Sequence, residues 1–206
     1  MLIGLDFDNT VAGYDHVFTA AAEREGLVEP GSTRNKIEVR EALRKLDDGE
    51  REWMRLQGRV YGVYMEEAEI IDGVGDFLST CRESGVSVCI VSHKTEFGHF
   101  DPDRVNLRKA ARNWMKNNRF FDPEGFAIDE RSVYFESTRQ KKIERIRALD
   151  CTHFVDDLEE VFKEPSFPDT TKRYLFAPST RPIPLGPFKP FTSWRDISND
   201  ILGCYH

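Results

Sequence analysis

Two aspartates stand two residues apart near the start of the sequence, in the segment DFDNT. Residues 2–7 are mostly apolar and predict a strand, and in an extended backbone Asp6 and Asp8 point to the same side. Paired carboxylates can serve as a nucleophile, as a general acid and base, or as ligands for a hard metal ion. This segment is therefore the first candidate for chemistry in the chain.

Polar side chains also follow three other apolar segments that predict strands. Ser92 ends GVSVCIVS, Lys141 and Lys142 follow VYFESTRQ, and Asp156 and Asp157 end THFVDD. In an open α/β sheet, ligands bind beyond the carboxyl ends of the strands. We therefore expect these strand ends to bring carboxylates, hydroxyls and a cation into one cluster.

The ordered set of DxDxT, a strand-ending serine, a lysine and an acidic pair resembles the four signature motifs of the haloacid dehalogenase superfamily. The resemblance covers residues 1–177, but it does not clearly include two insertions within that range. A single DxD would be weak evidence, whereas the full ordered set is specific.

The resemblance implies a role for each motif residue. Asp6 would be the covalent nucleophile, and Asp8 would be the general acid and base. Ser92 and a motif lysine would bind phosphate. Mg²⁺ would be held by Asp6, the backbone carbonyl of Asp8, and the pair Asp156 and Asp157.

The choice between the two adjacent lysines rests on helical spacing. Lys142, Ile146 and Leu149 share one helical face by i, i+4, i+7 spacing, which favours Lys142 as the residue directed at the sheet. Lys141 remains the alternative, and either lysine could instead be a solvated surface residue.

Several neighbouring residues are weaker candidates for phosphate or substrate binding. Thr10 is grouped with the phosphate-binding residues, although we expect it chiefly to hold the loop after Asp6. His93, Lys94 and His99 lie just past the strand-ending serine and could reach a substrate, but each could equally be a surface residue.

The acidic candidates also have plain structural interpretations. Asp8 could be only a metal ligand or a strand-end cap. Asp156 and Asp157 could cap the helix predicted for LEEVF. Glu160 could extend the acidic set, but a solvent-facing helical glutamate is the favoured interpretation.

The secondary-structure pattern predicts an α/β fold. Apolar segments alternate with longer amphipathic stretches, which is typical of a parallel sheet with helices on its faces. We expect a Rossmann-like three-layer core around a parallel five-stranded sheet, plus a small helical cap. The five predicted strands are residues 2–7, 86–92, 132–136, 152–156 and 173–177.

Two insertions interrupt this core, which we assign to residues 1–13 and 70–206. Residues 14–69 are mostly helical in pattern, with helices expected at 16–26, 36–50 and 52–69, and resemble the caps that close over substrates in the superfamily. The second insertion, residues 94–131, lies within the core and contains a helix predicted at 102–117.

One helical face of the cap offers candidate substrate contacts. Gln57, Arg59 and Tyr61 lie on or beside a face that also carries Trp53 and Tyr64. Some of these side chains could line the substrate pocket. The competing interpretation, that the aromatic residues pack the interior of the cap, is the favoured one.

Composition narrows the class of protein. The chain has 206 residues, a formal net charge of −7 and 32% charged residues, which describes a globular protein and argues against nucleic-acid binding. No segment resembles a membrane span or a signal peptide, so a cytoplasmic location is expected. The four cysteines lack CxxC spacing and predict buried thiols rather than disulfides or a zinc site.

Together these features predict a Mg²⁺-dependent phosphomonoester hydrolase that forms an aspartyl-phosphate. The expected partner is a small phosphorylated metabolite, either a sugar phosphate or a nucleotide. A phosphotransferase or phosphomutase would use the same intermediate, and a 2-haloacid dehalogenase would use the same nucleophile but has no need of Asp8. A non-catalytic binding protein on this scaffold is the alternative from another class.

Overall fold

The computed structural model describes residues 1–178 and 185–203, and the chain divides into two compact units. The first unit, the core, comprises Met1–Ala12, Ile70–Lys94 and Arg119–His206. The second unit comprises Gly13–Glu69 and Thr95–Asn118.

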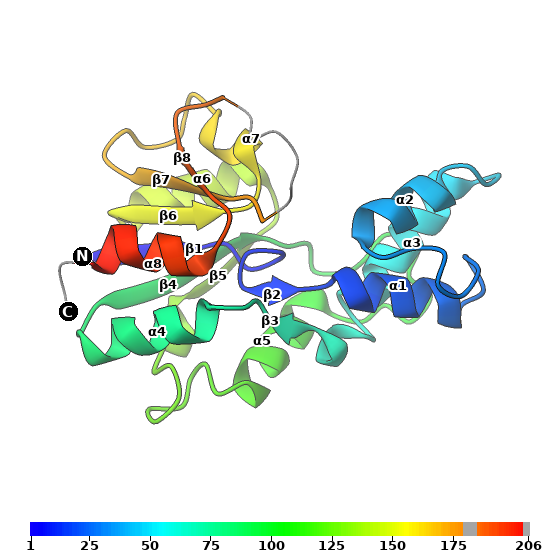
Figure 1. Cartoon of the computed structure of the whole chain (residues 1–206), viewed down its shortest axis with the longest axis horizontal. Coiled ribbons are helices and arrows are strands. Elements are labelled where there is room, and N and C mark those ends of the chain that lie inside the picture. The colour runs from blue at the N-terminus through cyan, green and yellow to red at the C-terminus, as the bar shows by residue number, and fades with distance from the viewer. Residues whose placement is uncertain (179–184, 204–206) are drawn as a thin grey trace. The chain divides into compact units, whose positions relative to one another are not determined.

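A parallel sheet of six strands forms the centre of the core within the described residues (Figure 1). Its strand order is β5-β4-β1-β6-β7-β8, so the first strand of the chain lies in the middle of the sheet. The strands are β1 (Leu2–Leu5), β4 (Ser87–His93), β5 (Val133–Glu136), β6 (His153–Asp156), β7 (Lys172–Phe176) and β8 (Lys189–Phe191).

The sixth strand corrects the prediction of a five-stranded sheet. The tail after residue 177 contains several prolines, which favour extended, non-helical chain and give no separate strand signal; Pro182 and Pro184 lie outside the described residues. Yet Lys189–Phe191 pairs with β7 at the edge of the sheet, where Pro190 costs little because an edge strand leaves one row of N–H groups unpaired.

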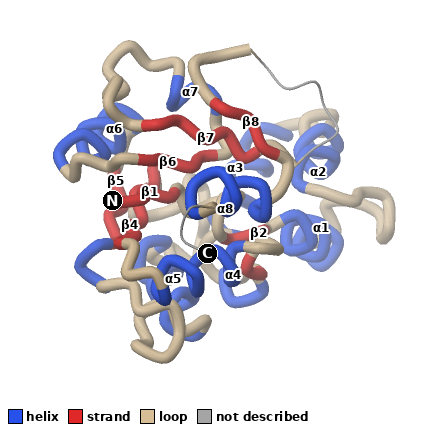
Figure 2. Tube along the Cα trace, turned by 60° about the vertical axis from the view of Figure 1, so that its left-hand side comes forward, coloured by secondary structure: helices blue, strands red, loops and turns tan. Residues whose placement is uncertain are grey.

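Helices cover both faces of the sheet, which confirms the expected three-layer α/β core. Figures 1 and 2 show α4 (Val74–Glu83) and α8 (Trp194–Leu202) on one face, and α6 (Arg139–Ala148) and α7 (Glu159–Phe162) on the other. The buried residues under α6 and α7 form one cluster: Cys89, Val91, Ile143, Ile146, Cys151, Phe154, Val161, Phe162, Phe167 and Leu175.

The position of β1 in the middle of the sheet depends on a small residue. A Cβ atom on Gly4 would lie 2.5 Å from the ring of Phe154 in the neighbouring strand β6. Glycine at position 4 therefore leaves room for the Phe154 ring beside β1. The close fit fixes the strand that carries the DFDNT segment.

The second unit is helical and has an aromatic interior. Its helices are α1 (Asp15–Arg24), α2 (Lys36–Leu43), α3 (Gly49–Val60), the short 3₁₀ helix η1 (Met65–Glu67) and α5 (Leu107–Asn117). Phe18 of α1 stacks on Trp53 of α3 at 5.1 Å between ring centroids, and Tyr61 meets Phe18 edge-on at 5.8 Å. These contacts bury the apolar faces of the helices against one another.

Two predicted helix boundaries in this unit are wrong for an identifiable reason. The helix expected over residues 36–50 ends at Leu43, and α3 begins at Gly49. Asp48 adopts a left-handed backbone with φ of 58°, and a Cβ on Gly49 would lie 2.0 Å from the carbonyl oxygen of Leu43. The DDG sequence therefore makes a tight turn. The helix expected over 52–69 ends at Val60, and only η1 follows.

The insertion predicted at residues 94–131 is divided between the two units. Thr95–Asn118 groups with the second unit, although the sequence places the whole insertion in the core. Helix α5 has a buried apolar face, and Trp114 on that face donates a 2.9 Å hydrogen bond to the carbonyl of Ala68. Arg59 forms an ion pair with Asp103 across the same two segments.

Three short elements complete the fold. β2 (Ala12–Gly13) and β3 (Glu69–Ile70) form a separate two-stranded sheet, and the 3₁₀ helix η2 (Glu130–Ser132) precedes β5.

None of the described helices is both long enough and apolar enough to cross a membrane. The three cysteines within the described residues, Cys81, Cys89 and Cys151, are buried free thiols, as predicted; Cys204 lies outside that part of the chain.

Candidate active site

Asp6 follows directly after β1, at the carboxyl edge of the sheet. Its backbone N–H donates a 2.9 Å hydrogen bond to Val155 of β6, so the backbone stays extended at this residue. The chain then turns tightly: Asn9 is left-handed with φ of 57°, and the N–H groups of Val11 and Ala12 both donate to the carbonyl of Phe7. This loop holds Asp6 at 4% exposure and leaves Asp8 partly exposed.

Lys142 joins Asp6 to the acidic pair at the end of β6. Its side chain is buried, and Nζ lies 2.6 Å from Asp6 Oδ1 and 2.6 Å from Asp156 Oδ2. Thr138 begins α6 by accepting a hydrogen bond from the N–H of Lys141, whose own side chain is exposed. The first turn of the helix therefore directs Lys142, and not Lys141, into the cluster, and Lys142 is the lysine favoured by the helical spacing.

The charges of this cluster are coupled. Burial acts to lower the pKa of Lys142, but Asp156 and Asp6 outweigh it and raise that pKa above its ordinary value. Burial also raises the pKa of Asp156, although Lys142 opposes the rise and Asp6 adds to it. The lysine is thus a permanent cation between two carboxylates that compete for it.

The carboxylates of Asp6, Asp156 and Asp157 converge closely enough to hold one metal ion. Each offers an oxygen, and these oxygens all lie within 4.8 Å of one another. Hard oxygen donors with net negative charge are the ligands that Mg²⁺ prefers. Asp156 also accepts a 3.0 Å hydrogen bond from the N–H of Leu158, which fixes one of its oxygens. Glu160 is exposed and does not belong to this three-carboxylate cluster.

Asp8 is held by a second buried lysine. Lys94 Nζ lies 2.9 Å from Asp8 Oδ1 and 2.8 Å from Asp8 Oδ2, and the lysine side chain is 2% exposed. The sequence suggests only that Lys94 could reach a substrate. Its pairing with Asp8, across 86 positions of the chain, has no local sequence signal.

The remaining candidates of the core also lie at this edge. Ser92 is 1% exposed near the end of β4. Thr10 is fully buried, with its hydroxyl 3.4 Å from Asp157 Oδ1 and its carbonyl accepting a 2.9 Å hydrogen bond from Trp194 Nε1. His93 is exposed, and its Nε2 lies 3.2 Å from the carbonyl oxygen of Ser137. Desolvation by the protein around the ring lowers the pKa of His93 below its ordinary value.

The substrate candidates Gln57, Arg59 and Tyr61 lie in the second unit and are partly buried there. Arg59 pairs with Glu25 at 2.6 Å and with Asp103, and the hydroxyl of Tyr61 accepts a 2.9 Å hydrogen bond from Lys36. These contacts account for Arg59 and Tyr61 as part of the interior of their own unit.

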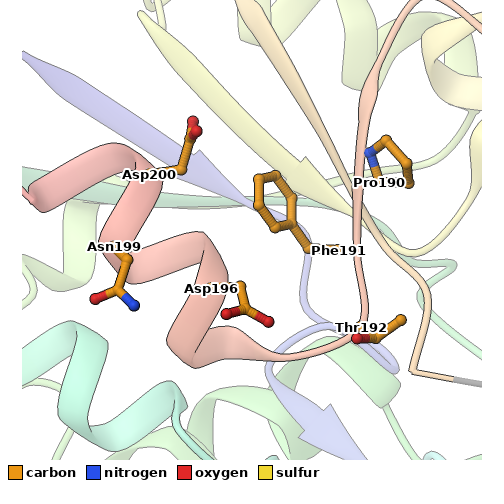
Figure 3. Close-up of a pocket in the computed structure, with 6 residues that line it drawn as sticks. All are labelled: Pro190, Phe191, Thr192, Asp196, Asn199 and Asp200. Carbon is orange, nitrogen blue, oxygen red and sulfur yellow. The ribbon is translucent and has the colours of Figure 1, made fainter.

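A second acidic region of the core lies at the edge strand. A surface hollow of about 530 Å³ lies between β8 and α8. Figure 3 shows two of the residues that line it, Asp196 and Asp200, on α8. Asp196 bonds to Ser193 at the start of the helix, and Asp200 accepts from the Tyr174 hydroxyl at 2.6 Å. The hollow is lined by Pro190, Phe191, Thr192, Asp196, Asn199 and Asp200.

Solved structures with the same fold cover nearly the whole chain. A haloacid dehalogenase family hydrolase from Deinococcus radiodurans R1, solved with bound phosphate and sodium, is 13% identical with a TM-score of 0.60, over 99% of this chain and 96% of that one. A hydrolase of the superfamily from Ehrlichia chaffeensis is 13% identical with a TM-score of 0.57, over 100% and 97%. An L-2-haloacid dehalogenase is 14% identical with a TM-score of 0.59, over 97% of each chain.

No protein-family model matches the sequence, and the comparison with curated protein sequences also finds no match. The similarity to known proteins is therefore found by comparing structures and not sequences. The chain has the fold of haloacid dehalogenase superfamily hydrolases, as the motif order predicts. Because similar structures include both a dehalogenase and a hydrolase with bound phosphate, fold alone does not choose the chemistry.

Proposed function

We propose that this protein is a Mg²⁺-dependent phosphomonoester hydrolase that acts through an aspartyl-phosphate on Asp6. The observation that carries the proposal is the buried contact of Lys142 with Asp6 and Asp156, each at 2.6 Å. This contact joins a nucleophilic carboxylate after β1, a cation for phosphate in the first turns of α6 and a metal-ligand carboxylate at the end of β6.

In the first half of the proposed reaction, an Asp6 oxygen attacks the phosphorus atom in line with the leaving group. The new bond joins Asp6 to phosphorus, the bond from phosphorus to the alkyl oxygen breaks, and Asp8 gives a proton to that oxygen. In the second half, Asp8 takes a proton from a water molecule. The water oxygen attacks phosphorus, and the bond to Asp6 breaks with release of phosphate.

Several side chains would stabilise the charge that develops on the phosphoryl oxygens. Lys142 is already positioned beside Asp6, and Ser92 and His93 lie at the end of the neighbouring strand β4. Donors fixed in a water-poor site stabilise a transition state because they need little reorganisation when charge develops. We assign these three residues to phosphate binding.

The carboxylates of Asp6, Asp156 and Asp157 would hold the magnesium ion. When bound, Mg²⁺ supplies positive charge that reduces the repulsion between the attacking carboxylate and the anionic phosphate. A structure of similar fold was solved with phosphate and sodium, which supports an anion and a cation in a site of this type.

Phosphoryl transfer fits the site better than dehalogenation does. A halide ion leaves without taking a proton, so displacement of halide gives no task to a second acid two residues after the nucleophile. Here Asp8 has a buried cation of its own, and a three-carboxylate cluster stands beside Asp6. In metal-assisted phosphate hydrolysis, Asp8 would transfer the proton and the three carboxylates would hold the metal ion.

A small phosphorylated metabolite is the proposed substrate, either a sugar phosphate or a nucleotide. Gln57 remains a candidate for selecting it, together with Arg59 and Tyr61, although the last two already have partners within the second unit. If Gln57 contributes to selection, Gln57→Ala should raise KM for the preferred substrate. An unchanged KM would show that Gln57 does not select the substrate.

The test is phosphate release from a panel of sugar phosphates, nucleotides and simple alkyl phosphates, with halide release from 2-haloacids measured in parallel. We expect turnover of at least one phosphomonoester with Mg²⁺, loss of turnover in EDTA and recovery when Mg²⁺ is restored. Halide release without phosphate release would overturn the proposal.

A further inference from the structure

The second buried lysine of the site has a specific geometry. Lys94 comes two residues after Ser92, and its backbone N–H donates a 2.9 Å hydrogen bond to Glu136, which extends the ladder between β4 and β5. Its Nζ lies within 2.9 Å of both oxygens of Asp8 and 5.6 Å from the centre of the Phe7 ring. The lysine is therefore fixed at its backbone and at its charged end.

This geometry restricts the Asp8 carboxylate to one orientation. A carboxylate held through one oxygen can still rotate, whereas a cation between both oxygens fixes the plane of the group. Burial strengthens the effect, because exposed ion pairs are screened by water and hold their partners only loosely. Asp8 itself keeps 18% of its side chain exposed, so it stays open to a substrate while its position is fixed.

Each of the two aspartates of the DFDNT segment thus contacts its own lysine. Lys142 comes from α6 and contacts the proposed nucleophile, while Lys94 comes from the end of β4 and contacts the proposed proton-transfer residue. Proton transfer needs donor and acceptor atoms within hydrogen-bond reach. A displacement of about 1 Å can cost on the order of 100-fold in rate.

We propose that Lys94 is a positioning residue that holds Asp8 for proton transfer in both halves of the reaction. The inference rests on the proposed function. Lys94 contacts the Asp8 carboxylate and acts through it, and it takes no part itself in forming or breaking the bonds to phosphorus. Its loss should therefore affect the steps that need proton transfer and spare a step that does not.

The leaving group separates these steps. p-Nitrophenolate leaves without a proton, so phosphorylation of Asp6 by p-nitrophenyl phosphate does not depend on Asp8. Hydrolysis of the aspartyl-phosphate still does. In rapid-quench measurements, Lys94→Met should keep the burst of p-nitrophenolate and slow the steady state by on the order of 100-fold. With glycerol phosphate, a poor leaving group, the first step should slow as well.

Three further variants control the test. Lys94→Arg keeps a cation and should recover part of the lost steady-state rate. Lys172→Met removes an exposed lysine at the opposite, amino end of β7 and should leave both phases unchanged. Adding Lys94→Met to Asp8→Asn should cause no further loss, because a residue that acts through Asp8 has no effect once that carboxylate is gone.

The results separate this inference from the proposed function. If wild-type protein shows no turnover that depends on Asp6, the proposed function fails. If wild-type protein turns over through Asp6 but Lys94→Met has normal kinetics, only the inference fails. An equal loss of burst and steady state, a rise in KM alone, or an additive loss in the double variant would also overturn it.

Discussion

Two acidic regions of the core use similar residues in different ways. At the carboxyl edge of the sheet, Asp6 and Asp156 are almost fully buried and share one buried lysine. In the hollow beside α8, Asp196 bonds to a helix-capping serine, and Asp200 bonds to Tyr174 and to the exposed Lys189 (Figure 3).

The two regions differ in the partners that hold the charged aspartate side chains. Each aspartate of the hollow has a structural partner close to the surface, so its charge stabilises the edge of the fold. The carboxylates at the strand ends come from distant parts of the sequence and are held together in a buried place, where unneutralised charge is costly. A candidate active site is therefore marked by carboxylates that come together in a buried place from distant parts of the sequence. A group of acidic residues beside a surface hollow is not enough.

The largest expected effect is the loss of activity in Asp6→Asn. An amide cannot form the covalent intermediate, so phosphate release should fall at least about a thousandfold. Asp200→Asn, in the hollow, is the matched control and should keep wild-type turnover. Comparable losses in both variants would contradict the distinction between the two regions.

The next effect concerns stability. Lys142→Met leaves Asp6 and Asp156 buried without their shared cation, which should lower the free energy of unfolding by about 3–5 kcal/mol. Urea unfolding in EDTA measures this change, and added Mg²⁺ should restore part of it.

Lys163→Met is the control for that measurement. Lys163 forms an i,i+4 pair with Glu159 on the surface, so its loss should cost less than about 0.5 kcal/mol. If the two lysine variants unfold at the same urea concentration, Lys142 is not a buried link of the cluster.

The smallest expected effect depends on pH. The hydrogen bond from Tyr174 lowers the pKa of Asp200; burial opposes the shift and Lys189 adds to it. Because the folded pKa is depressed, ionised Asp200 adds stability above its unfolded pKa of about 4, and this stability is lost as pH falls through the folded value.

Asp200→Asn should therefore lower the free energy of unfolding by about 1 kcal/mol at pH 7, and the difference from wild type should shrink towards pH 3. Thermal unfolding across this range measures it. A difference that is constant with pH would show that the charge of Asp200 is not what stabilises the edge strand.

Much of the fold could be predicted because its signals are local. The apolar run of β4 and the alternation of strands with amphipathic helices indicate a parallel sheet. Strand β8 could not be predicted, since a three-residue edge strand with a proline gains its stability from pairing with β7. The grouping of α5 with the second unit likewise depends on tertiary contacts of Trp114.

In the candidate site, too, the residues with a local sequence signal could be predicted and the contact between distant residues could not. The DFDNT segment and the acidic pair are visible as strand ends, and helical spacing favours Lys142 over Lys141. The pairing of Lys94 with Asp8 is a contact between residues 86 positions apart, and nothing in the spacing predicts it.

The most direct test of the account is to trap the aspartyl-phosphate. The Asp8→Asn variant should form the intermediate from p-nitrophenyl phosphate with Mg²⁺ and hydrolyse it slowly. Reduction with borohydride converts an aspartyl-phosphate to homoserine, and mass spectrometry of the peptides locates it. We predict homoserine at position 6, dependent on substrate and Mg²⁺. Phosphate release by the wild-type protein with no trapped modification at Asp6, or with one at another residue, would contradict the account.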